Sequence, residues 1–104
     1  MAHEKMKRKV YEKLRTVIDP ELHIDIVSLG LVYDVKVTGG KINILMTLTT
    51  PGCPLAPVID RMVKDATSDI EGVKAEDVSL EITFDPPWTA DMMSEEARLE
   101  LGIL

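Results

Sequence analysis

The first segment of the chain has the hydrophobic spacing of an amphipathic helix. Between Glu4 and Val17, apolar residues recur at intervals of four, four and three positions, which places them on one face of an α-helix. Tyr11 and Ile18 widen this face. We expect the helix to end at Asp19-Pro20, because proline has no amide proton and disfavours helical geometry in the residue before it.

Two segments with a period of two follow and predict a β-hairpin. Residues 29–37 and 42–49 each alternate between two faces, as strands with one buried face do. The first apolar face is Leu31, Tyr33, Val35 and Val37; the second is Ile42, Ile44, Met46 and Leu48, with Asn43, Leu45, Thr47 and Thr49 opposite. Gly39-Gly40 between the segments can adopt the positive φ angles of a two-residue hairpin turn.

A second amphipathic helix and a third strand complete the regular pattern. Apolar residues from Leu55 to Ile70 follow helical spacing, and Gly72 suits a left-handed cap after this helix. Residues 78–84 alternate and predict a strand with Phe84 on its apolar face, ending before prolines that cannot donate to a sheet. Ser94 followed by two glutamates predicts the start of a short C-terminal helix.

The order α-β-β-α-β predicts a small two-layer sandwich of the α/β (α+β) class. We expect a three-stranded mixed sheet with helices mainly on one side, followed by the short C-terminal helix. A chain of 104 residues has the size of one domain, so residues 1–104 are expected to form a single domain.

Composition narrows the classes of function. The formal net charge of −6 argues against nucleic acid as a partner. No apolar run approaches the roughly 20 residues of a membrane span, so no membrane anchoring is expected. The opening MAHEKMKRKV lacks the apolar core of a signal peptide, and a single cysteine cannot form an internal disulfide; both features favour the cytoplasm.

The only cysteine, Cys53, lies in the turn TTPGCPLAP between the second strand and the second helix. Pro54 suits the first position of a helix, so Cys53 is expected at or beside the N-cap. Unpaired amides and the helix dipole there favour a thiolate, which is both a nucleophile and a metal ligand. Thr49 and Thr50 bring hydroxyls to the same strand end. The alternative is that Cys53 is a small buried hydrophobe, and the residues alone do not choose.

One sulfur cannot complete a metal site, since structural zinc sites and typical iron–sulfur clusters use about four protein ligands. Cys53 would be one ligand of a shared site, with His3, His23, nearby carboxylates or a second chain supplying the others. Asp19, in Asp19-Pro20-Glu21, has two interpretations. It ends the first helix, or it lies near the cysteine turn and accepts hydrogen bonds there from threonine hydroxyls or backbone amides.

Trp88 follows two prolines and precedes a pair of methionines. We expect it to cover the edge of the core, with Met92 and Met93 packing beside it. The alternative is an exposed tryptophan–methionine surface that binds a partner.

Four motifs in this order resemble the iron–sulfur cluster assembly family of small stand-alone domains, which includes SufT-like proteins and the PaaD protein of phenylacetate degradation. The motifs are Asp19-Pro20-Glu21, residues 28–33 (SLGLVY), residues 49–54 (TTPGCP) and residues 85–88 (DPPW). The resemblance spans about residues 4–95.

The resemblance implies a SufT-like maturation factor for iron–sulfur proteins that is not an enzyme. Cys53 would be the functional residue and metal ligand, with Asp19 near it and Thr49 and Thr50 flanking it. Iron or an iron–sulfur cluster would be held transiently, and the partners would be iron–sulfur assembly proteins and apo-client proteins. The chain has neither a GxxxxGK[ST] motif nor a CxxC pair. This leaves ligation shared in a homodimer, or delivery through partner contacts, as alternatives.

Two other functions remain open. The first is a cofactor-free adaptor, or a PaaD-like accessory protein of a multicomponent oxygenase, that binds its partner through the polar face of the sheet or the Trp88 region. The second is a thiol-dependent enzyme in which Cys53 is the nucleophile. The second has less support, because no clear general base accompanies the cysteine and His23 is the only interior histidine.

Overall fold

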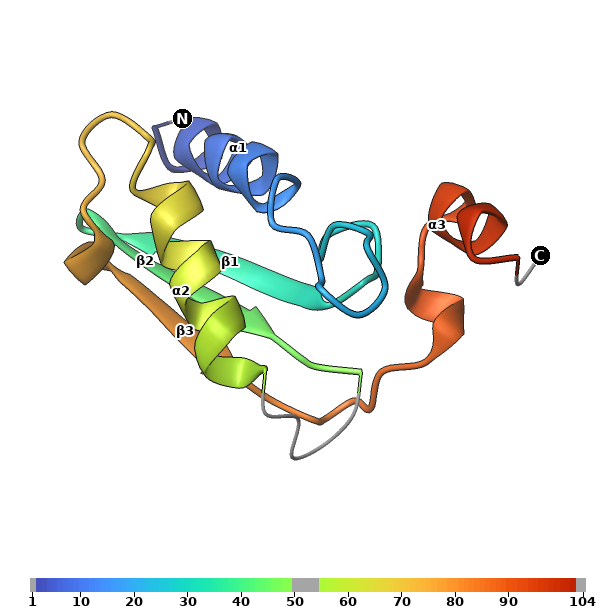
Figure 1. Cartoon of the computed structure of the whole chain (residues 1–104). Helices are drawn as coiled ribbons and strands as arrows, with labels where there is room; N and C mark the ends of the chain where they lie inside the picture. The colour runs from blue at the N-terminus through green and yellow to red at the C-terminus, as the bar shows by residue number, and fades with distance from the viewer. Residues whose placement is uncertain (1, 50–54, 103–104) are drawn as a thin grey trace.

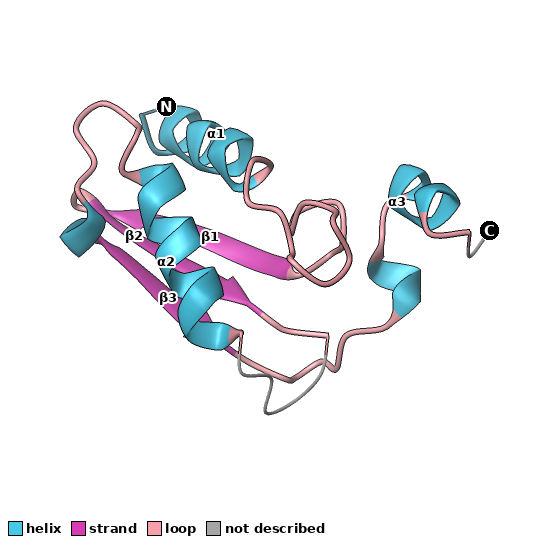
Figure 2. Ribbon diagram, in the orientation of Figure 1, coloured by secondary structure: helices cyan, strands magenta, loops and turns pink. Residues whose placement is uncertain are grey.

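The computed structural model describes residues 2–49 and 55–102 of the chain, with side chains from Glu4 onward. The elements, in chain order, are α1 (Ala2–Leu14), β1 (Val32–Thr38), β2 (Lys41–Met46), α2 (Ala56–Thr67), β3 (Val78–Ile82) and α3 (Glu95–Glu100). The strands form one sheet in the order β1-β2-β3, with α1 and α2 in contact over one face and α3 beyond one end (Figure 1 and Figure 2). The predicted two-layer fold with a mixed sheet is confirmed. Among the described residues, no helix is long and apolar enough to cross a membrane.

Helix α1 ends earlier than its hydrophobic pattern predicts. The expected end at Asp19-Pro20 is wrong, since the last helical residue is Leu14. The amide of Val17 donates to the Leu14 carbonyl oxygen three residues back, at 3.1 Å, and this tighter turn closes the helix. Val17 is still buried, whereas Ile18 is 42% exposed and does not widen the apolar face.

Strands β1 and β2 form the predicted antiparallel hairpin. Its turn residues, Gly39-Gly40, have φ angles of 54° and 82°. A bulge between Val32 and Asp34 interrupts the alternation of β1. The expected place of Tyr33 in the apolar face is therefore wrong. Its hydroxyl instead donates to the Pro86 carbonyl oxygen at 2.7 Å.

Helix α2 connects β2 to β3, which pairs with β2 in parallel. The helix buries Ile59 against the sheet and begins at Ala56, with Leu55 as its N-cap. Pro54, which was expected to be the first helical residue, lies outside the described residues. Gly72 has the predicted left-handed φ, 85°, but it lies in the turn after the helix rather than directly after its last residue.

A single cluster of buried apolar side chains fills the space between the sheet and the helices. The predicted face of β2 contributes Ile42, Ile44 and Met46. The irregular loop before β1 is buried just as deeply, because Ile26, Leu29 and Leu31 have no exposed surface. Phe84 was expected on the buried face of the third strand; this is wrong, since β3 ends at Ile82 and Phe84 is 40% exposed.

Residues 88–102, called the C-terminal segment below, dock onto the loop that precedes β1. Trp88 Nε1 donates to the Leu29 carbonyl oxygen at 2.7 Å. The amide of Ser94 donates to the Ser28 carbonyl oxygen at 2.8 Å. Trp88 thus packs at the edge of the core as predicted.

The docked segment leaves no room for a side chain at Gly30. This glycine has a φ of 78°, and a Cβ at this position would overlap the carbonyl group of Met92. Farther along, the Ser94 hydroxyl accepts a hydrogen bond from the Ala97 amide at 3.1 Å, which confirms Ser94 as the N-cap of α3. Close backbone contact therefore fixes the C-terminal segment against the loop.

We predict that Gly30→Ala loosens this contact. Any non-glycine residue at positive φ costs about 1–2 kcal/mol, and the forced overlap should add about 1–3 kcal/mol to the loss of folding free energy. Gly72→Ala is the matched control, since Gly72 also has positive φ but open space around it. Denaturant unfolding measures the difference, and amide exchange at Met93 and Ser94 should accelerate only in Gly30→Ala. Equal losses in both variants would contradict the prediction.

Candidate functional site

The topology brings four segments of the chain to one end of the sheet. β1 begins where its antiparallel neighbour β2 ends, and β3, parallel to β2, ends there as well. The loop before β1, the residues after β2, the first turn of α2 and the segment after β3 therefore lie at this end (Figure 1). We call it the motif end, because each of the four sequence motifs overlaps one of these segments.

Asp19 shapes the loop that leads into the motif end. Its side chain is only 6% exposed, and its Oδ1 atom accepts hydrogen bonds from the amides of Glu21, at 2.8 Å, and Leu22, at 3.0 Å. The Asp19 amide donates to the Ile24 carbonyl oxygen at 2.9 Å, and its own carbonyl oxygen accepts from His23 at 2.8 Å. The amides that the carboxylate binds thus belong to its own loop. Its expected position beside the cysteine turn stays a prediction.

The end of β2 leads directly into the predicted cysteine turn. Thr47 donates its amide hydrogen to the Leu31 carbonyl oxygen at 2.8 Å and is fully buried, although the alternation of its strand gave no reason to expect a buried threonine. Thr49 follows in a half-buried bend. Thr50 and Cys53 lie outside the described residues, and their roles stay predictions.

The first turn of α2 brings backbone amides to the motif end. Leu55, the N-cap, supplies no side-chain acceptor, and its carbonyl oxygen accepts the first helical bond from Ile59 at 2.8 Å. The amides of Ala56 and Val58 have no partner within the helix, as is usual for a first turn. The positive end of the α2 dipole therefore points toward this end.

The other predicted ligands do not gather into a metal centre in the described part of the chain. Within residues 2–49 and 55–102, no group of three or more His, Cys, Asp and Glu side chains could hold a metal ion. His23 is exposed, in a turn with a φ of 60°, and the side chain of His3 lies outside the described part. His23 therefore belongs to no such group among the described residues, and His3 stays a prediction.

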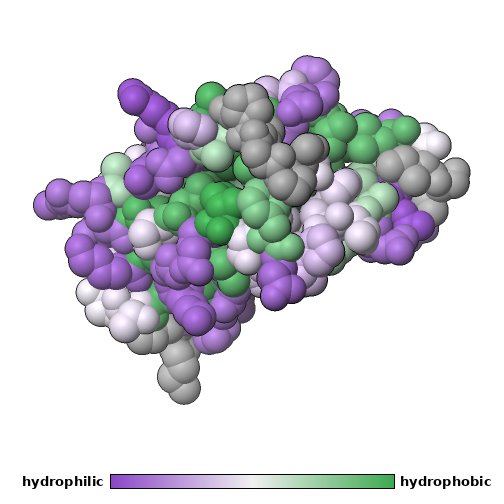
Figure 3. Space-filling model, turned by 90° about the horizontal axis from the view of Figure 1, so that it is seen from below, coloured by the Kyte–Doolittle hydropathy of each residue, from purple (hydrophilic) through white to green (hydrophobic). Residues whose placement is uncertain are grey.

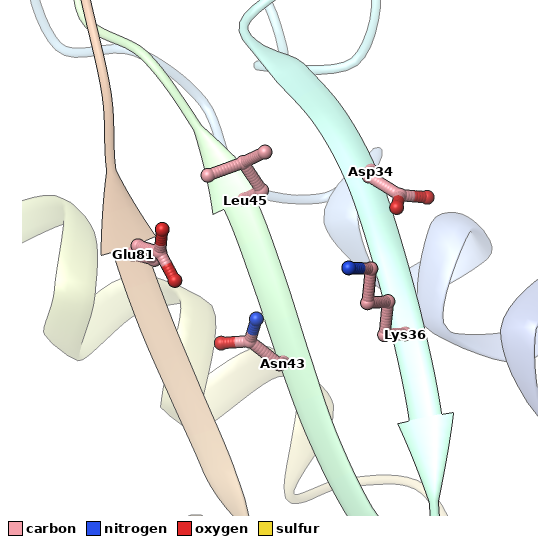
Figure 4. Close-up of a pocket in the computed structure, with 5 residues that line it drawn as sticks. All are labelled: Asp34, Lys36, Asn43, Leu45 and Glu81. Carbon is pink, nitrogen blue, oxygen red and sulfur yellow. The ribbon is translucent and has the colours of Figure 1, made fainter.

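The face of the sheet that the helices leave open is mostly polar. Figure 4 shows the side chains that line a small hollow on this face: Asp34, Lys36, Asn43, Leu45 and Glu81. Asp34 also lies 3.9 Å from Lys7 Nζ on α1. Burial raises the pKa of Tyr11, and the nearby Asp34 carboxylate adds to the rise. The edge of β1 next to α1 thus carries mixed charge.

Toward the motif end, the open face becomes apolar and hollow. A groove of about 580 Å³ is lined by Gly30, Val32, Tyr33, Leu45, Asp85, Pro86 and Met92. The view from below in Figure 3 shows a stretch of hydrophobic surface bordered by hydrophilic side chains. The sequence reasoning missed this groove. The available signal was Leu45, an apolar residue on the predicted polar face of its strand.

A family comparison gives these segments a common context. The sequence model described as "Iron-sulfur cluster assembly protein" matches residues 7–80, well over half of the chain. The match begins in α1 and extends into β3, and so includes the loop of Asp19 and the predicted cysteine turn.

Individual relatives match over almost their whole length. The chain is 50% identical to the Fe-S protein maturation auxiliary factor YitW of Bacillus subtilis, covering 96% of this chain and 97% of that protein. It is 49% identical to the Fe-S protein maturation auxiliary factor SufT of Staphylococcus aureus, over 84% of this chain and 98% of that protein.

Two further comparisons concern a longer relative and a solved structure of similar length. An iron-sulfur cluster carrier protein of Deinococcus radiodurans is 40% identical over 73% of this chain, which spans only 21% of that protein. The crystal structure of a domain of unknown function from Bacillus anthracis superimposes with a TM-score of 0.92 at 40% identity, covering 100% of this chain and 98% of that one.

We predict that Asp19→Ala destabilises the loop at the motif end. The substitution removes the acceptor of two amide hydrogen bonds in a buried position, and a bond to a charged group contributes about 1.5–3 kcal/mol. Asp19→Asn is the control, because an amide oxygen can still accept from Glu21 and Leu22. Urea unfolding should show a loss of roughly 2 kcal/mol or more for Ala and a clearly smaller loss for Asn. If both variants unfold like the wild type, the carboxylate does not hold the loop.

Proposed function

Because the chain belongs to the iron–sulfur cluster assembly protein family, we propose that it is a maturation factor for iron–sulfur proteins. It holds iron or an iron–sulfur cluster transiently through the Cys53 thiolate and passes it to an apo-protein. The observation that carries this proposal is that the described parts of the motif-bearing segments converge at one end of the sheet. A rigid scaffold that presents loop residues together is a common arrangement for binding.

The neighbourhood of Cys53 supports a thiolate. Cys53 lies two positions before Leu55, the N-cap of α2, so their Cα atoms are at most about 7 Å apart. The start of a helix and its dipole favour negative charge in that neighbourhood. The lower thiol pKa expected there makes Cys53 a ligand at neutral pH.

A single thiolate suits a cargo that is handed on rather than retained. Iron–sulfur clusters use about four cysteine ligands when stably bound. Cys53, even together with Thr49, Thr50 and Asp19, cannot supply such a set. The remaining ligands would come from the donor, from the recipient or from a second copy of the chain, and exchange among them would move the cargo.

The names of the relatives favour a non-enzymatic role, which we place in the cytoplasm. The relatives of similar length are named as maturation auxiliary factors, and the longer one as a cluster carrier. Assembly proteins and apo-clients are then the partners.

We predict that Cys53→Ser abolishes cluster binding and delivery. Anaerobic reconstitution of the full chain with iron and sulfide should give the visible absorption of a cluster, and transfer to an apo-ferredoxin should restore the absorption of the holo-ferredoxin. A serine hydroxyl is not deprotonated at neutral pH, so both signals should fall to the level without protein.

The control moves the thiol instead of removing it. In Cys53→Ser combined with Ser68→Cys, one cysteine remains but lies at the opposite, negative end of α2. This variant should not recover delivery. Delivery by Cys53→Ser at the wild-type rate would refute the proposal.

A further inference from the structure

The apolar groove on the open face of the sheet has walls that are already fixed. The Tyr33 hydroxyl donates to the Pro86 carbonyl oxygen at 2.7 Å and lies 3.7 Å from Met92 Sδ. Trp88 lies between Pro86 and Met92 in the chain, and its indole nitrogen donates a hydrogen bond to the Leu29 carbonyl oxygen. A groove whose walls are hydrogen-bonded in advance needs little ordering when it binds another molecule.

The rim of the groove is acidic on the side of β3. Asp85 lines the groove itself, and Glu81 lines the adjoining hollow, which shares Leu45 with it. Asp34, which also lines that hollow, lies 3.9 Å from Lys7 Nζ. Lys36 is the only basic residue among the lining residues of the two hollows. Among the described residues, neither Glu81 nor Asp85 has a basic side chain within 4.0 Å.

These charges disfavour a second copy of the chain as the occupant. In a two-fold symmetric dimer, the same patch of each protomer faces its counterpart. An acidic rim would then meet an acidic rim, and like charges brought together oppose association. The complementary occupant is a different molecule that carries positive charge beside an apolar group.

We propose that the groove binds a segment of a protein partner in which leucine-like side chains are flanked by lysine or arginine. The apolar side chain enters between Tyr33, Leu45 and Met92, and the basic side chains approach Glu81 and Asp85. The inference rests on the proposed function in that a delivery factor must recognise a partner. It assigns this recognition to the open face of the sheet and requires no metal.

The test uses two synthetic peptides and the full chain labelled with nitrogen-15. One peptide of eleven residues alternates leucine with lysine, and the other carries glutamate in place of each lysine. In a buffer without iron or sulfide, the basic peptide should shift the amide signals of Tyr33, Leu45 and Met92, and added salt should weaken its binding. The acidic peptide should cause no such shifts.

Matched variants locate the binding. Asp85→Lys should weaken the basic peptide about twofold to fivefold, within the range of one exposed ion pair. Asp65→Lys, which makes the same charge change on the exposed side of α2, should not weaken it. Leu45→Lys, which places a charge on the groove floor, should abolish the shifts. Val58→Lys is its control, because Val58 is 46% exposed on α2.

Three results would overturn the proposal: groove signals that do not respond to the basic peptide, equal responses to both peptides, or groove signals of the protein alone that change with its concentration. The Cys53→Ser variant should bind the basic peptide like the wild type. The two experiments can therefore fail independently. Absence of peptide binding would not contradict cluster delivery, and absence of cluster delivery would not contradict peptide binding.

Discussion

The structure depends on satisfying the backbone of an irregular loop that is buried as deeply as a central strand. Ile26, Leu29 and Leu31 have no exposed surface, yet they lie outside any regular element, where buried amides and carbonyls must find other partners. The Ile26 amide bonds to Val17, the Leu31 amide to Ile26, and the Leu31 carbonyl to Thr47. These bonds connect the end of α1 to the end of β2.

Everything at the motif end follows from this loop. Because its inner side completes the core, its outer side is a fixed platform for the C-terminal segment, which contacts it through Trp88 and Ser94. The close approach at Gly30 leaves Met92 beside Tyr33, and the two form one wall of the apolar groove. A feature that stabilises the fold thus also shapes a surface on which a partner can bind.

The two proposals assign different functions to different parts of the chain. The cysteine turn, by proposal, carries the chemistry, while the groove on the open face carries recognition. Strand β2 provides the floor of the groove with Leu45, and the chain continues from its end to Thr49, just before the predicted cysteine turn. A partner held on the open face would remain near the turn where cargo is exchanged.

The sequence by itself determined the elements with a clear period, the hairpin turn, the cap of α3 and the family. Spacing reports which side of a helix or strand is apolar, and Gly39-Gly40 and Ser94 act through local backbone geometry. It did not determine the end of α1, the displacement of Tyr33 by a bulge, or the burial of Thr47, because these depend on contacts between residues distant in the chain. The groove is of the same kind: only the tertiary structure brings residues 30–33, Leu45 and residues 85–92 together, since no local pattern records that three separated segments share a surface.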